Sequence, residues 1–204
     1  VRSKTTFLGL CKSPELSCQV TIEAQEILGV DAAILFADLL PILEPMGFGL
    51  DYIEGRGPVI DNPVRETKDV DRVQDHDPVE TMPFVYDTIR LIRRGLKPNI
   101  PLIGFSGLPF TLAAYAIEGG GSKHFQAVKS FMWSDEGAWN AMLSRFTDVI
   151  IKYVNAQIDA GVQVIQLFDS WVGSLSPQDY KRYVAPHSKR VIDGIKGRVP
   201  VIHF

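Results

Sequence analysis

Short, almost wholly apolar runs alternate with longer segments of helical pattern, and this alternation constrains the fold more than any other feature of the chain. The apolar runs lie at Asp31–Phe36, Pro101–Phe105, Val162–Phe168 and Val199–Phe204. Helical segments are expected at about 14–28, 79–96, 109–117, 124–132, 136–160 and 177–196. Continuous apolar runs are typical of parallel strands buried on both faces, and their alternation with helices indicates βα units. Right-handed crossovers then leave two α/β folds, a closed barrel or an open doubly wound sheet.

The segment between the first two apolar runs interrupts this alternation. Its sequence GFGLDYIEGRGP at 47–58 predicts a hairpin-like excursion near 48–60 that lies outside the parallel core. No linker or fixed-period repeat divides the sequence, so we expect a single domain over 1–204. The last apolar run reaches the final residue, Phe204, and four strands are about half of an eight-stranded barrel. We therefore expect the sequence to be part of a longer protein.

Composition and charge narrow the classes of function. Of the 204 residues, 46% are hydrophobic and 22% are charged, which is typical of a globular domain with a substantial core. No apolar stretch approaches the roughly 20 residues of a membrane helix, and the N-terminus lacks the pattern of a signal peptide. The net charge of −3 gives no general attraction to nucleic acid or to an anionic membrane. We expect a cytoplasmic protein with neither kind of partner.

Cysteine and histidine spacing gives no sign of a metal centre. Cys11 and Cys18 are seven residues apart, without a second pair or a CxxC motif, and are expected to be buried thiols. The histidines have no i,i+4 pairing with one another or with cysteine; they are His76, His124, His187 and His203. His76 belongs to the charged run 69–77, which is most simply a solvated surface connection.

The strongest candidates for function follow the apolar runs, because ligands of parallel α/β proteins bind at the carboxyl ends of the strands. That rule selects Asp38, Ser106-Gly107, Asp169-Ser170 and His203. Asp38 is flanked by apolar residues, where a carboxylate is costly unless something pairs with it. A helix N-cap and a functional carboxylate are both open for Asp38. Asp169 and Ser170 remain free for a ligand, whereas Ser176 is assigned to capping the helix that starts with Pro177.

A glycine-rich loop, EGGGS at 118–122, follows the helical segment that contains Tyr115. Consecutive glycines can point backbone N–H groups at an anion, but the spacing fits neither GxxxxGK[ST] nor GxGxxG. The loop also follows a helix, where those motifs follow a strand. A sharp helix termination is therefore favoured, and Tyr115 by itself indicates only a core aromatic residue.

Five segments in register resemble the uroporphyrinogen decarboxylase family. FADLL at 36–40 is similar to that family's F-[SA]-D-I-L segment, and GRGP at 55–58 is similar to its GKGP loop. PLIGFSGLPFT at 101–111 resembles its PLIGFAGAPWT strand. Tyr115 with the glycine-rich loop, and QLFDSWVG at 166–173, also match in the same order. The resemblance covers essentially the whole chain.

This resemblance implies a (β/α)8 TIM-type barrel, incomplete here, and a homodimer that needs neither metal nor organic cofactor. The implied activity is decarboxylation of the four acetate side chains of uroporphyrinogen, a tetrapyrrole on the route to heme, to give coproporphyrinogen. In the family, the residue matching Asp38 accepts hydrogen bonds from the pyrrole N–H groups, and the residue matching Tyr115 supports it. Ser170 matches a serine that contacts a substrate side chain, and Phe105 and Phe168 are expected to line the apolar floor.

The resemblance has gaps, and two alternatives stay open. The family's N-terminal arginines, which grip the substrate carboxylates, and the histidine of its C-terminal loop are absent from the sequence. One alternative is a cobalamin-dependent methyltransferase of the same superfamily, which binds zinc through a His-x-Cys pair near the position of His203. The Asp38 segment and the glycine-rich loop favour the decarboxylase. The other alternative is a catalytically incompetent fragment that keeps only the barrel architecture.

Overall fold

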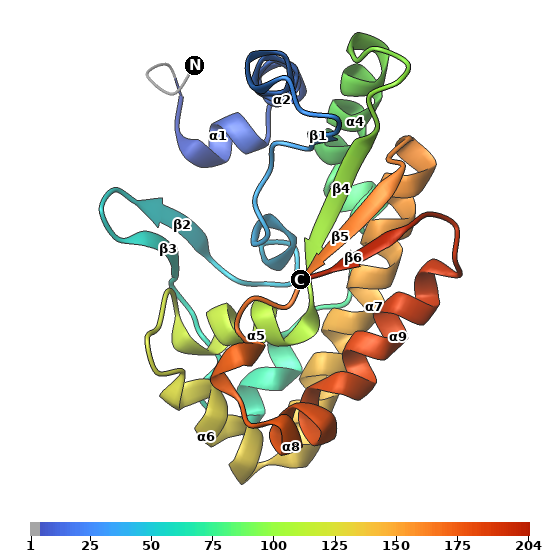
Figure 1. The fold of residues 1–204 in the computed structure, drawn as a ribbon. Helices are drawn as coiled ribbons and strands as arrows, with labels where there is room; N and C mark the ends of the chain where they lie inside the picture. Colours follow the sequence, from blue (N-terminus) through green and yellow to red (C-terminus); the bar gives the residue numbers. More distant parts are fainter. Residues whose placement is uncertain (1–4) are drawn as a thin grey trace.

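A four-stranded parallel sheet forms the centre of the computed structural model, which describes residues 5–204. Its strands, in the order β1-β4-β5-β6, are β1 (Ala33–Ile34), β4 (Leu102–Gly107), β5 (Val164–Phe168) and β6 (Val201–His203). Apart from the sheet, β2 (Leu50–Ile53) and β3 (Gly57–Ile60) pair as an antiparallel hairpin (Figure 1). Consecutive parallel βα units are the arrangement of a (β/α)8 barrel, and the described residues supply four of its strands. The single-domain organisation stays a prediction.

The helices agree well with the segments expected from the apolar pattern. They are α1 (Phe7–Cys11), α2 (Pro14–Leu28), α3 (Pro78–Thr81), α4 (Pro83–Gly95), α5 (Pro109–Glu118), α6 (Gln126–Ser134), α7 (Glu136–Ala160), α8 (Pro177–Asp179) and α9 (Ala185–Ile195). Single turns of 3₁₀ helix lie at η1 (Pro41–Leu43) and η3 (Val172–Ser174), and a longer one at η2 (Thr67–Arg72). The start of α2 shows why sequence predicts such boundaries. Ser13 accepts a hydrogen bond from the amide of Leu16, and Pro14 occupies the first helical position.

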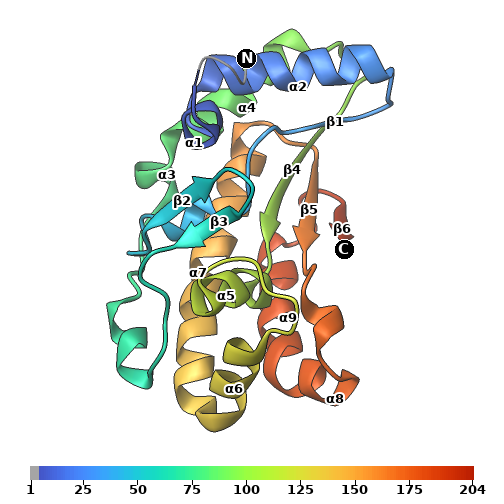
Figure 2. The same cartoon turned by 90° about the vertical axis from the view of Figure 1, so that its left-hand side faces the viewer.

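The two faces of the sheet have different surroundings. Helices α7 and α9 pack against one another behind β4 and β5, as Figures 1 and 2 show. On that side Ile165 and Leu167 are completely buried. On the opposite side Ile34 of β1 is 46% exposed and Ile202 of β6 is 43% exposed. This exposure of the two edge strands is what four strands of an eight-stranded barrel would show.

Strand β1 is shorter than the apolar run at Asp31–Phe36, because side chains take over the hydrogen bonds of its ladder. The Leu35 amide still donates to the carbonyl of Ile103 in β4. The next amide, that of Phe36, donates 2.9 Å to the hydroxyl of buried Thr21 in α2. In β4, both backbone groups of Phe105 bind the side-chain amide of Gln157 in α7, at 3.0 and 2.8 Å. The chain is thus released from the sheet shortly before Asp38.

Proline divides two of the expected helices. The segment at 79–96 is split into α3 and α4 because Pro83 has no amide proton to continue the helix past Met82. The segment at 177–196 contains a π-helical stretch, η4 (Tyr180–Val184), between α8 and α9. Pro186 follows this stretch closely, and the missing donor of a proline is a common reason for a change in helical register.

The charged run at 69–77 is less exposed than expected. Val70 and Val73 are each only 3% exposed, and their backbone carbonyls accept hydrogen bonds from the guanidinium of Arg145. The prediction of a simple solvated connection was therefore wrong in part. The many charged residues of this run indicate a solvated segment, but Val70 and Val73, three residues apart, are buried in the core.

Candidate active site at the end of the first parallel strand

Asp38 lies on the turn that carries the chain from β1 into η1. One carboxylate oxygen, Oδ1, accepts a 2.9 Å hydrogen bond from the amide of Leu40, so the side chain shapes the turn before the helix. The N-cap of η1 is Leu40, and Asp38 is thus not a helix cap in the strict sense. The carboxylate is half-buried and makes no ion pair with any residue among 5–204. It is a charged group near the carboxyl end of a parallel strand with capacity left for further hydrogen bonds.

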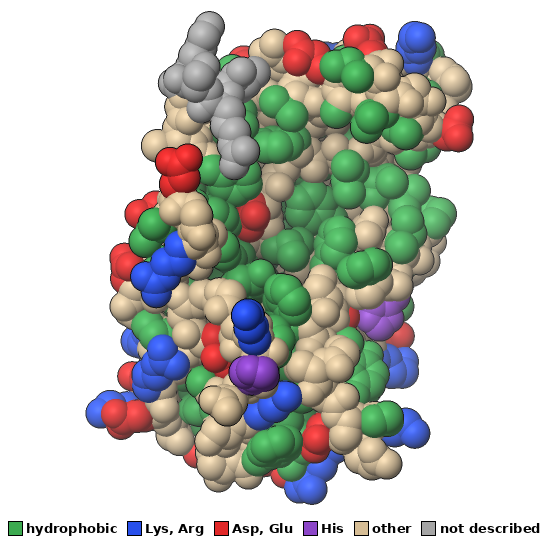
Figure 3. All heavy atoms as spheres, turned by 60° about the vertical axis from the view of Figure 1, so that its left-hand side comes forward, with side chains coloured by type: hydrophobic (Ala, Val, Ile, Leu, Met, Phe, Trp, Pro, Cys, Tyr) green, Lys and Arg blue, Asp and Glu red, His purple; other side chains and the backbone are tan. Residues whose placement is uncertain are grey.

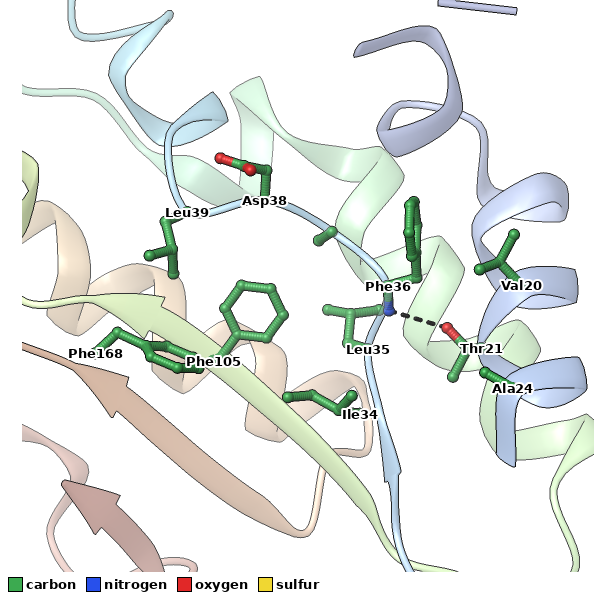
Figure 4. A pocket seen from close by; sticks show the side chains of 11 residues that line it. Val20, Thr21, Ala24, Ile34, Leu35, Phe36, Asp38, Leu39, Phe105 and Phe168 are labelled. Atoms are coloured by element: carbon green, nitrogen blue, oxygen red, sulfur yellow. Dashed lines mark hydrogen bonds between the residues drawn. The ribbon is translucent and has the colours of Figure 1, made fainter. Parts of the chain in front are cut away.

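Two hollows meet at Asp38. The first, which we call the apolar hollow, has a volume of about 370 Å³ and lies between α2, the β1 edge and the open face of the sheet. Its lining residues are Val20, Thr21, Ala24, Ile34, Leu35, Phe36, Ala37, Asp38, Leu39, Phe105 and Phe168. Figure 4 shows that the carboxylate of Asp38 points away from the ring of Phe105 and from Leu39.

The second, which we call the hairpin hollow, has a volume of about 760 Å³ and lies between the start of α1 and the β2–β3 hairpin. Its lining residues are Thr5, Thr6, Phe7, Asp38, Tyr52, Ile53, Glu54, Gly55 and Gly57. The molecular surface is hollowed on this side, and apolar side chains gather beside the depression (Figure 3). Asp38 is the residue common to the linings of both hollows.

Weak acids from three different elements surround the Asp38 carboxylate. Burial, followed by the negative charge of Asp38, raises the pKa of Cys11 in α1 to about 12 and raises the pKa of Tyr52 in β2. The same two causes, in the same order, raise the pKa of Tyr115 in α5. These side chains therefore keep their protons at neutral pH and face the carboxylate as neutral groups. Segments distant in sequence converge on Asp38.

The residues proposed from the sequence occupy different parts of this region. Phe105 and Phe168 both line the apolar hollow with Asp38, and their rings meet edge to face with centroids 5.8 Å apart. Tyr115 lies outside both hollow linings, but the charge of Asp38 reaches it, and its ring packs against that of Trp171 at 6.0 Å. Ser170 directly precedes Trp171, is exposed, and lines neither hollow. Its assignment to substrate, like the other site assignments, stays a prediction.

Asp169 is not free for a ligand at the strand end, which corrects the expectation from its position. It is 2% exposed and points to the helical side of the sheet, where Ser188 of α9 donates a 3.3 Å hydrogen bond to Oδ2. The imidazole of His203 lies 3.6 Å from the same oxygen. Burial raises the pKa of Asp169 to about 6 against the opposing effect of His203. Alternation along β5 explains the orientation, since buried Ile165 and Leu167 share its face.

Tyr52 is the residue of this site that the sequence reasoning missed. Its hydroxyl is buried and has no hydrogen-bond partner among the described residues. A signal was present, because the alternation of β2 puts Tyr52 on the same face as buried Leu50. The more conspicuous local pattern is the neighbouring GRGP turn, in which Gly55 and Gly57 have φ of 76° and 83°.

The cationic and metal-binding potential of the site is limited within the described residues. Among residues 5–204, no lysine or arginine lines either hollow. Residues 5–204 contain no group of three or more His, Cys, Asp or Glu side chains arranged to hold a metal ion. No helix in this part of the chain is long and apolar enough to cross a membrane. The glycine-rich loop terminates α5, because its first glycine, Gly119, adopts the left-handed conformation at φ 85°.

Comparison with known proteins decides the family. The model of the uroporphyrinogen decarboxylase (URO-D) family matches residues 1–204. The chain belongs to the uroporphyrinogen decarboxylase family. A uroporphyrinogen decarboxylase of Carboxydothermus hydrogenoformans is 52% identical over all of this chain and 59% of that protein. One from Geobacter metallireducens is 49% identical, again over all of this chain and 60% of that protein. The chain therefore spans about three fifths of the length of these relatives.

Solved structures support the fold of this family member. A methyltransferase from Methanosarcina mazei superposes with a TM-score of 0.73 at 22% identity, covering 94% of this chain and 56% of that one. A B12-independent methionine synthase from Shewanella sp. superposes with a TM-score of 0.52 at 12% identity, covering 93% and 50%. At these identities the likeness concerns the barrel architecture alone. The family match, by contrast, favours the decarboxylase over the methyltransferase alternative.

Proposed function

We propose that the complete protein decarboxylates the four acetate side chains of uroporphyrinogen to give coproporphyrinogen, and that Asp38 is its central catalytic carboxylate. This proposal rests on the surroundings of the Asp38 side chain. It is a half-buried carboxylate without an ion-pair partner among residues 5–204, at the meeting point of two hollows near the carboxyl end of a parallel strand. Family membership supplies the reaction, and the geometry supplies a residue suited to it.

The chemistry explains what such a carboxylate would do. Protonation of a pyrrole carbon next to an acetate arm makes a cation that accepts the electron pair released when the arm loses CO2. A fixed negative charge beside the macrocycle stabilises the cation as it forms, and more strongly where water is excluded. Oδ1 of Asp38 is held by the Leu40 amide, so the carboxylate meets the substrate in a defined orientation. Oδ2 has no hydrogen-bond partner in the described structure and is available for pyrrole N–H donors.

The apolar hollow suits the rest of a macrocycle. Phe105 and Phe168 supply apolar surface in the hollow that Asp38 also lines, on the side away from its carboxylate. The eight carboxylates of the substrate need cations, and the described residues that line the two hollows include no lysine or arginine. We therefore assign the grip on the acidic arms to residues outside these linings. Tyr115 supports Asp38 in this proposal, and Ser170 contacts one acidic arm.

The test is turnover of uroporphyrinogen by the complete protein carrying Asp38→Asn. Asparagine keeps the size of the side chain and one acceptor oxygen for the Leu40 amide, but it removes the charge. We expect kcat to fall about a hundredfold, equivalent to roughly 3 kcal/mol, while KM changes much less. Asp31→Asn is the matched control, because Asp31 is exposed and lies just before the other end of β1. Unchanged kcat in Asp38→Asn would refute the role of the charge.

Two further features belong to this proposal. We assign the protein to the cytoplasm as a homodimer that uses no metal or organic cofactor. Activity of the metal-stripped protein, with no gain on adding zinc, is the expected result. A zinc requirement would instead support the methyltransferase alternative. Absence of any turnover by the complete wild-type protein would support the noncatalytic alternative.

A further inference from the structure

The hydroxyl of Tyr52 is an unexplained polar group beside the proposed catalytic carboxylate. It is buried without a hydrogen-bond partner among residues 5–204. Leaving a buried hydroxyl unpaired costs about 1–3 kcal/mol, so such groups usually have a reason to be where they are. A phenylalanine would fill the same space in the hairpin without that cost.

Tyr52 is held in place by the pairing of its strand and by an aromatic neighbour of its ring. It stands on β2, in register with Pro58 of β3. Its ring packs against that of Phe7 in α1 with centroids 4.7 Å apart, and Phe7 in turn meets Phe36 edge to face at 6.3 Å. The side chain therefore bridges the hairpin and the segment that leads to Asp38.

Asp38 has an acceptor oxygen to spare, and Tyr52 has a hydroxyl that can donate to it. Oδ1 of Asp38 is engaged by the Leu40 amide, whereas Oδ2 has no partner in the described structure. Burial, then the charge of Asp38 and the action of its carboxylate as an acceptor, raise the pKa of Tyr52, so the hydroxyl keeps its proton near neutral pH. Both residues line the hairpin hollow. The hydroxyl and the carboxylate are therefore near neighbours, although in this structure they do not form a well-aligned hydrogen bond.

We propose that Tyr52 is a positioning residue, whose hydroxyl donates a hydrogen bond to Oδ2 of Asp38 and fixes the plane of the carboxylate when a macrocycle is bound. This inference rests on the proposed function. It gives Asp38 two neutral supports from different elements, Tyr52 from the hairpin and Tyr115 from α5. Tyr52 acts through Asp38 and does not itself contact the reacting carbon.

The kinetic test uses Tyr52→Phe in the complete protein. This change removes one oxygen and keeps the packing against Phe7. We expect kcat to fall about tenfold with KM within about threefold, since one charge-assisted hydrogen bond is lost. Tyr86→Phe is the matched control. The Tyr86 hydroxyl is also buried without a hydrogen-bond partner in the described part of the chain, but its ring packs on that of Tyr153 in the helical layer, with centroids 6.4 Å apart. We expect the control to keep kcat within about twofold.

A double variant separates positioning from a structural effect. In the Asp38→Asn background, Tyr52→Phe should lower kcat no further, because its effect passes through the carboxylate. An equal loss in both backgrounds would overturn the inference, as would unchanged kcat in Tyr52→Phe alone. A fall in thermal stability without a fall in kcat would show that Tyr52 only packs the hairpin.

An NMR measurement tests the pairing of Tyr52 with Asp38 without relying on turnover, and so separates this inference from the proposed function. With 3-fluorotyrosine at position 52, binding of coproporphyrinogen should shift the ¹⁹F resonance in the wild type and not in Asp38→Asn. If Asp38→Asn retained full turnover, the catalytic role of Asp38 would fail, yet the ¹⁹F shift would still show whether the two residues pair. The same shift in both proteins would contradict the pairing.

Discussion

Replacing Gln157 with leucine tests how the floor of the site is held. The Gln157 side chain is completely buried in α7, where it accepts from the Phe105 amide and donates to the Phe105 carbonyl. It does so where β1 has already left the sheet, so no strand is present to replace these bonds. Leucine is similar in volume but leaves both backbone groups buried and unpaired. Each such group costs about 1–3 kcal/mol, so we expect a loss of about 2–6 kcal/mol in stability.

The assay for Gln157→Leu is urea unfolding of the complete protein, combined with amide hydrogen exchange resolved to individual segments. Exchange should rise selectively over β4, above all at Phe105. Gln19→Leu is the control, because Gln19 lies exposed on α2, where its side-chain amide donates to the neighbouring Glu23. The control should change stability by less than about 0.5 kcal/mol. If Gln157→Leu neither lowered the unfolding midpoint nor raised exchange over β4, the idea that Gln157 substitutes for the ladder would be refuted.

Two further predictions concern the titrating groups. The pKa of Asp169 is raised from 3.8 to about 6 in the folded state, so stability is greatest below pH 4 with respect to this group and declines as pH rises to about 6. The decline, about 3 kcal/mol from a shift of roughly two units, should disappear in Asp169→Asn when unfolding is measured from pH 4 to 7; an unchanged pH profile would contradict it. Asp38→Asn should lower the pKa of Cys11 and speed its alkylation at pH 9 but not that of Cys18, whose pKa is raised by burial and Glu15. Equal changes at both cysteines, measured by mass spectrometry, would indicate general loosening instead.

Sequence predicted the elements of this fold because their signals are local. Ser13 and Pro14 mark the start of α2, and Gly119 marks the end of α5. The length of β1 could not be predicted in this way. It depends on Thr21 and Gln157, which lie 15 and 52 residues from the backbone groups they bind. Only tertiary packing brings those side chains to the strand.

The candidate site was predictable in outline and not in detail. The rule that ligands bind at strand carboxyl ends selected Asp38, and the family resemblance gave it a role. The same rule selected Asp169, which the alternation of β5 turns toward Ser188. Tyr52 could not be predicted as a site residue, because its proximity to Asp38 depends on how the hairpin packs. No local pattern within β2 encodes that placement.

The most direct test of the account is a crystal structure of the complete protein with coproporphyrinogen bound. We predict that the macrocycle occupies the space beside Asp38, with pyrrole nitrogens within hydrogen-bond distance, about 2.7–3.2 Å, of the carboxylate oxygens. Phe105 and Phe168 should lie beneath its apolar surface. A macrocycle bound with its nitrogens away from Asp38, or a carboxylate occupied only by the backbone of its own turn, would contradict the central claim.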